Sequence, residues 1–152
     1  MRALGISVDP AAGSPKVHVA TIEARPSSPR SVEAFTIKTT ETEPGAQAVS
    51  LARLLQGRLP GLSFDAAAIK TAGASPVARR NRATFQRAHA EGALLFVLHE
   101  VSDVRVEAKD AQGLATLAGK KKADLESAAD AAAEGLSRKY RDAVYAALAL
   151  LP

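Results

Sequence analysis

The segment FDAAAIK, residues 64–70, places the strongest constraint on how this chain of 152 residues can fold. Between Asp65 and Lys70 it is entirely apolar. A strand with one face in water alternates polar and apolar residues, whereas a strand covered on both faces is a nearly continuous apolar run. The segment therefore predicts an interior strand of a sheet that is covered on both faces, in an α/β fold.

Three predicted strands precede this segment. Residues 2–9, 16–24 and 31–40 carry alternating apolar side chains, and turn-forming sequences rich in Gly, Pro and Ser separate them. Brief polar connections of this kind are typical of antiparallel neighbours. The first part of the chain is therefore predicted to be a three-stranded antiparallel meander.

Most of the remaining chain has helical periodicity. Residues 41–58 are predicted to form a helix that Gly57 and Pro60 end. The later elements are predicted as a helix over residues 76–101, a fifth strand over 103–108, and helices over 109–119, 123–135 and 137–151. One alternative stays open: the long helix ends at Gly92, and residues 93–100 form a strand.

The composition is that of a globular protein, with 47% hydrophobic and 24% charged residues, and no low-complexity linker divides it. We therefore expect a single domain over residues 1–152. The absence of Cys excludes disulfides, thiolate metal sites and cysteine nucleophiles. No apolar run reaches the roughly 18 residues that a membrane span needs, and residues 1–10 lack the apolar core of a signal peptide. These features predict a cytoplasmic protein with no membrane partner.

The chain is basic, with a formal net charge of +4, and its cations are clustered. A basic surface favours anionic partners such as DNA or RNA, because Lys and Arg bind phosphates without regard to sequence. The alternative is that each cluster is an ordinary solvated helix face or loop. The candidates for nucleic-acid binding are Arg79, Arg80, Arg82, Lys120, Lys121, Lys122, Arg138, Lys139 and Arg141.

This order of strands and helices resembles the ribonuclease H-like fold, and local phrases resemble RuvC-type resolvases. ISVDP followed by KVHVATIEA is similar to their first hairpin, and RDAVYAALALL is similar to their terminal helix. AAIK together with KYRDAVYAALALL also resembles a small bacterial family of this fold whose function is not established. The resemblance implies a ribonuclease H-like mixed sheet of five strands, the first three antiparallel, flanked by helices.

The chemistry that the resemblance implies is metal-dependent phosphodiester hydrolysis. Two Mg²⁺ ions about 3.5–4 Å apart need three or four converging carboxylates, because Mg²⁺ prefers oxygen ligands. On this sequence, Asp9 matches the acid of the first strand and Asp142 matches one acid of the pair in the last helix. The second member of that pair falls on Tyr145, and the acid at the end of the fourth strand falls on Lys70. Two of these positions therefore lack a carboxylate.

Each of these residues has a second interpretation. Asp9 precedes Pro10, where Asp is a common turn residue, and an alignment on Gly5 and Ile6 would move the acidic position to Ser7. Asp142 suits the first turn of any helix because of the helix dipole. Lys70 either neutralises the remaining acids in place of a metal ion or extends to solvent from a strand end.

No other catalytic motif stands out. His18, His89 and His99 are isolated in the sequence and are interpreted as surface or structural histidines. The chain has no glycine-rich phosphate loop of the Walker type and no glycine elbow around a serine.

Three functional interpretations follow. The preferred one is a degenerate, non-catalytic RuvC-like protein that acts in nucleic-acid binding or regulation through its basic surface and needs no cofactor. The second is a divergent nuclease that holds Mg²⁺ or Mn²⁺ with Asp9 and Asp142. The third is an interaction or assembly module whose Ala-rich helices pack against a protein partner or a second copy of the chain.

Overall fold

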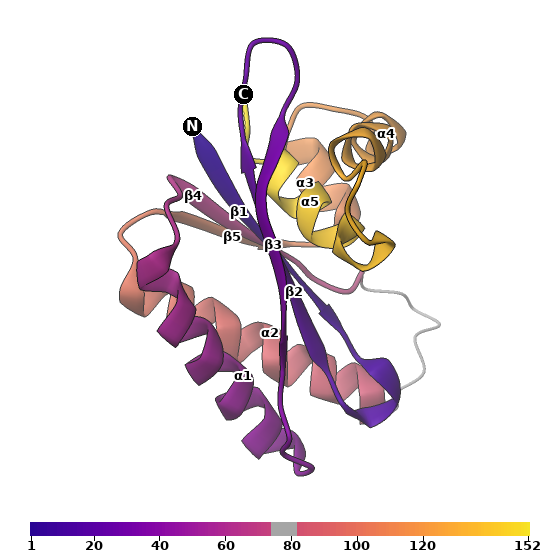
Figure 1. The fold of residues 1–152 in the computed structure, drawn as a ribbon. Helices are drawn as coiled ribbons and strands as arrows, with labels where there is room; N and C mark the ends of the chain where they lie inside the picture. Colours follow the sequence, from indigo (N-terminus) through magenta and orange to yellow (C-terminus); the bar gives the residue numbers. More distant parts are fainter. Residues whose placement is uncertain (74–81) are drawn as a thin grey trace.

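A computed structural model describes residues 1–73 and 82–152 (Figure 1). Its strands and helices follow the order β1 (Arg2–Asp9), β2 (Lys16–Glu23), β3 (Arg30–Lys38), α1 (Pro44–Arg58), β4 (Ala66–Lys70), α2 (Arg82–Val101), β5 (Arg105–Lys109), α3 (Ala111–Leu117), α4 (Lys122–Ala132) and α5 (Arg141–Leu148). Short 3₁₀ helices lie at η1 (Ala11–Gly13), η2 (Leu59–Gly61) and η3 (Arg138–Tyr140).

The strands form one five-stranded mixed sheet in the order β3-β2-β1-β4-β5. The first three strands pair antiparallel, whereas β4 runs parallel to both β1 and β5. The predicted fold class is confirmed. The prediction for the fourth strand also holds, because the side chains from Ala66 to Ile69 are all buried, at most 2% exposed.

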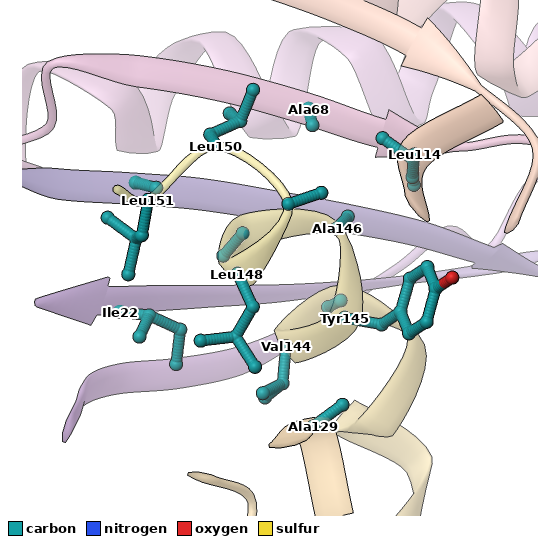
Figure 2. Packing of buried hydrophobic residues seen from close by; sticks show 14 of the residues in the cluster. Ile22, Ala68, Leu114, Ala129, Val144, Tyr145, Ala146, Leu148, Leu150 and Leu151 are labelled. Carbon is teal, nitrogen blue, oxygen red and sulfur yellow. The ribbon is translucent and has the colours of Figure 1, made fainter. Parts of the chain in front are cut away.

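Helices cover both faces of this sheet, and the two covered faces have different cores. Helices α1 and α2 lie on one face, and α3, α4 and α5 lie on the other (Figure 1). The α1–α2 face is filled with Leu, Ile and Val side chains. The α5 face is rich in Ala, and there Val144 and Leu148 of α5 pack near Ile22 and Ala129 (Figure 2).

Gly5 of β1 lets α5 lie directly on the sheet. A Cβ atom at this position would be only 1.8 Å from the backbone oxygen of Ala143 and 2.6 Å from the backbone nitrogen of Ala147. No side chain larger than hydrogen fits without moving the helix. The close approach of α5 to β1 brings the first turn of α5 beside the ends of β1 and β4.

The elements after β4 largely follow the sequence predictions, with three differences. Helix α2 continues through Gly92 to Val101, so the alternative strand over residues 93–100 is wrong. The fifth strand begins at Arg105, two residues later than predicted. The last predicted helix is divided into η3 and α5, which begins at Arg141. Among the described residues, no helix combines the length and the apolarity needed to cross a membrane.

Candidate functional site

The candidate site lies where β1 and β4 end side by side and the first turn of α5 passes next to them. The parallel register pairs Ser7 with Lys70, and the antiparallel register pairs Ser7 with His18. Parallel neighbours present their carboxyl ends at the same edge of a sheet, which is where open α/β sheets commonly bind ligands. The sheet thus brings together residues that are far apart in the sequence.

Lys70 and Asp142 form an ion pair at this edge. The Lys70 Nζ donates to Asp142 Oδ1 at 2.6 Å. The same ammonium lies 4.8 Å from the centre of the Tyr145 ring, a distance that allows a cation–π interaction. The Lys70 side chain is only 17% exposed, whereas that of Asp142 is 49% exposed. Lys70 therefore does not simply extend to solvent from the strand end.

Tyr145 occupies a buried position under this pair. Its hydroxyl donates to the backbone oxygen of Ala111 at 2.7 Å, which joins α5 to the start of α3. Burial raises the pKa of the Tyr145 phenol above its ordinary value, and the nearby Glu126, Asp110 and Asp142 carboxylates raise this pKa further. The ring therefore serves as a neutral, packed side chain.

Asp9 does not take part in the Lys70–Asp142 pair. Its Oδ1 accepts from the backbone N–H of Ala11 at 3.0 Å, across the turn that begins at Pro10. Ala11 has a positive φ of 35°, and a bond to its N–H helps to hold this uncommon conformation. The Asp9 carboxylate has the turn role that the sequence offered as one interpretation, and it also faces His18, with 4.0 Å between Oδ2 and Nε2.

His18 is buried beside Asp9 and belongs to a hydrogen-bonded chain. Its Nδ1 lies 3.0 Å from Thr36 Oγ1, and the Thr36 hydroxyl donates to the Tyr140 hydroxyl at 3.2 Å. The Nδ1 atom donates to the Thr36 hydroxyl in one tautomer of the neutral ring and accepts from it in the other. Burial lowers the pKa of His18 below 6.5, although the Asp9 carboxylate opposes this shift.

A cleft of about 340 Å³ opens between these elements. Four cationic side chains share its lining with the two acids. The lining residues are Ser7, Val8, Asp9, Pro10, His18, Arg87, Arg138, Lys139, Arg141 and Asp142.

The predicted basic residues divide into separate groups. Arg138, Lys139 and Arg141 lie at the cleft, and Arg141 forms a two-pronged pair with Asp130 that lowers the pKa of the Asp130 carboxyl. Arg82 and Lys120–Lys122 are exposed but do not line the cleft. Arg79 and Arg80 lie outside the described residues.

The sequence interpretation missed three residues of this site. Arg87 was passed over although it belongs to the basic run before it, and it lines the cleft while pairing with Glu91 at 2.7 Å. His18 was interpreted as isolated because Asp9 is distant along the chain. Ser7 was considered only as an alternative acid position. For Ser7 and His18 the available signal was that each is a polar residue among alternating apolar residues of a strand. Ser7 lies near the end of β1 and His18 near the start of β2, so both lie at the same edge of the sheet.

The residues present do not fit a centre of two divalent cations. Such a centre needs converging carboxylates, but an ammonium binds Asp142 and a phenol ring fills the second predicted acid position in α5. In residues 1–73 and 82–152, no group of three or more His, Asp or Glu side chains is arranged to hold a metal ion. We therefore derive no metal-dependent step from this arrangement.

The fold is similar to that of Holliday junction resolvases of known structure. Thermus thermophilus RuvC in complex with a Holliday junction substrate gives a TM-score of 0.70 at 18% sequence identity, over 98% of this chain and 92% of that chain. Another T. thermophilus RuvC structure gives 0.68 at 21% identity over the same shares. The yeast mitochondrial resolvase Ydc2 gives 0.57 at 11% identity, over 97% of this chain and 77% of that chain.

These likenesses define the class of fold. The chain has a RuvC-like, ribonuclease H-like fold, as its strand order and local phrases predicted. No protein-family model and no curated protein matches the sequence.

Proposed function

We propose that this chain is a non-catalytic RuvC-like protein that binds nucleic acid through a basic surface. The observation that carries the proposal is the Lys70–Asp142 ion pair at the edge of the sheet, beside a cleft lined by Arg138 and Lys139. An ammonium can neutralise an acidic site, but it cannot ionise a bound water as a metal ion does. The cations beside it can still contact phosphates.

The likeness to RuvC supports the choice of partner. One of the similar structures is a RuvC in complex with a Holliday junction substrate, and its fold matches nearly the whole of this chain. A protein with such a scaffold and a cleft lined by cations, whose predicted acid positions hold Lys70 and Tyr145, is better suited to binding than to cleavage.

Binding to DNA and RNA is the direct test. We expect labelled duplex, branched and single-stranded probes to bind, with an affinity that falls steeply between about 50 and 200 mM salt and depends little on sequence. Replacing Lys120, Lys121 and Lys122 with Ala should reduce the slope of log K against log salt by roughly one for each lysine that contacts a phosphate. Fluorescence anisotropy over a salt series measures both quantities.

Two outcomes would contradict the proposal. An affinity that is absent at low salt would remove nucleic acid as a partner. Cleavage of a branched or duplex probe in Mg²⁺ or Mn²⁺ that Asp9→Asn abolishes would establish the divergent nuclease instead, because only a catalytic carboxylate explains that loss.

A further inference from the structure

Ser7 presents a hydroxyl at the bottom of the cleft. The residue is only 4% exposed, yet it lines the cleft between Val8 and His18. Within the part of the chain that the structure describes, its Oγ has no hydrogen-bond partner. This hydroxyl is open to the cleft, and a hydroxyl that faces a cleft can donate a hydrogen bond to a ligand.

Two of the four cations at the cleft have no carboxylate partner among the described residues, although the Lys139 Nζ lies 4.9 Å from the Tyr140 ring centre. Arg87 pairs with Glu91, and Arg141 pairs with Asp130. Arg138 and Lys139 are exposed, and neither forms an ion pair with any described residue. Their backbone is anchored, because Tyr140 of the same 3₁₀ turn accepts a hydrogen bond from Thr36 and contacts the His18 ring edge-on.

The acids of the cleft do not cancel these cations. Lys70 balances Asp142 within the protein. Asp9 directs its Oδ1 to the N–H of Ala11. The charged groups of the cleft without a charged partner are therefore two cations, Arg138 and Lys139, and one carboxylate, Asp9, which already accepts a hydrogen bond. This balance of charge favours the binding of a monoanion.

We propose that the cleft binds one phosphate group directly, without a metal ion, through the Ser7 hydroxyl and the Arg138 and Lys139 side chains. This inference rests on the proposed function, and it assigns the phosphodiester of a nucleic-acid backbone as the ligand class. The Lys70–Asp142 pair supplies the neutralisation that a bound cation would otherwise provide.

The test uses the dinucleotide thymidylyl-thymidine, which has a single phosphodiester, in an NMR titration of the full chain with EDTA. We expect saturable shifts of the Ser7, His18 and Lys139 amides, the same Kd when Mg²⁺ replaces EDTA, and no such shifts with thymidine. Arg138→Ala/Lys139→Ala should weaken binding by about ten-fold or more, and Ser7→Ala by a few-fold, because hydrogen bonds to charged groups are among the stronger ones.

A matched control is available on the opposite face of the sheet. Arg53→Ala/Arg58→Ala also removes two exposed cations. Each double variant also removes one cation–π contact: Arg58 lies 5.0 Å from the Phe35 ring centre, and Lys139 lies 4.9 Å from the Tyr140 ring centre. This variant should bind the dinucleotide with unchanged Kd. Equal losses in the two double variants would show a general charge effect and overturn the proposed site.

The remaining outcomes separate this inference from the proposed function. If duplex DNA binds but the dinucleotide leaves the cleft amides unshifted, the phosphate site is wrong and nucleic-acid binding stands. A Kd that requires Mg²⁺ would overturn direct binding. Inorganic phosphate that binds more tightly than the dinucleotide would reassign the site to free phosphate and overturn the backbone ligand.

Discussion

The two acids of the cleft lie in contrasting surroundings. On the β4 side, Asp142 is bound by an ammonium that rests over the Tyr145 ring. On the β2 side, Asp9 is bound only by a backbone N–H and faces a buried imidazole at 4.0 Å. We call these the paired half, made of Lys70, Asp142 and Tyr145, and the unpaired half, made of Ser7, Asp9 and His18.

The difference shows two ways in which a fold can stabilise a carboxylate at the edge of a sheet. In the paired half, a side chain from another strand supplies the opposite charge. In the unpaired half, backbone hydrogen bonding and exposure to water suffice, and no opposite charge is needed. The paired half depends on the placement of α5, whereas the unpaired half depends on a local turn.

The largest expected effect comes from displacing α5. Gly5→Ala places a Cβ atom 1.8 Å from the Ala143 oxygen, so the helix or the strand must move. We expect a loss of about 4 kcal/mol or more in the free energy of unfolding, because the obstructing atoms are backbone. Urea denaturation measures this loss.

Gly92→Ala is the matched control. Gly92 lies in α2, and an added Cβ would meet nothing within 4 Å. The same substitution there should stabilise the protein by about 0.8 kcal/mol through helix propensity. A neutral effect of Gly5→Ala would contradict the close packing of α5 on β1, and with it the origin of the paired half.

Reversing the charge of Lys70 tests the paired half itself. Lys70→Glu puts a second carboxylate beside Asp142, and we expect a loss of about 2 kcal/mol, less than for a deeply buried pair because Asp142 is half exposed. Mn²⁺ at about 100 times its Kd should then restore about 2.7 kcal/mol, since it binds only the folded state. Thermal melts with and without Mn²⁺ measure both effects.

Lys70→Met separates charge from packing in this experiment. Methionine keeps an unbranched side chain over Tyr145 but offers no carboxylate, so its melting temperature should not respond to Mn²⁺. An equal response of the Glu and Met variants to Mn²⁺ would place the metal elsewhere. A silent Lys70→Glu substitution would show that the ion pair contributes nothing to stability.

Most of the fold could be predicted from the sequence because its strands have distinct patterns. The apolar run at Ala66–Ile69 indicated a strand covered on both faces, and the alternation in residues 2–40 indicated the antiparallel part. The end of α2 was ambiguous, because residues 93–100 are apolar enough for either a strand or a buried helix. Packing of Leu94 and Leu98 against the sheet decides in favour of the helix.

The site was only partly predictable, because its geometry depends on pairing between distant segments. The resemblance matched Lys70 and Asp142 to positions at the end of a strand and in the last helix, and the strand order brings these two positions together at the sheet edge. It could not show that Asp9 would turn toward Ala11, which depends on the local conformation after Pro10. Nor could it place Arg87 at the cleft, because that depends on how α2 packs against the β1–β2 turn.

The unpaired half contains the titrating group of the cleft, His18. The charges that act on its ring come from every side: Asp9 at the end of β1, Lys16 of β2, Lys139 of η3 and Asp142 of α5. Burial has the largest influence and lowers the pKa of His18 below 6.5, while the two acids raise this pKa and the two lysines lower it. Folding therefore favours the neutral ring.

The smallest expected effect follows from this direction. Because the unfolded chain binds the His18 proton more readily, stability should be complete above pH 6.5 and fall as the pH drops from 6.5 toward the lower folded pKa. The acids with lowered pKa values, such as Glu23 and Glu107, act only below about 4.5 and lie outside this window. Urea midpoints at pH 7.5 and 5.5 measure this fall in stability. His18→Asn, whose amide can hydrogen-bond Thr36 but does not titrate, should abolish the slope. An unchanged slope in that variant would assign the titration to another group and leave His18 as a simple packing residue.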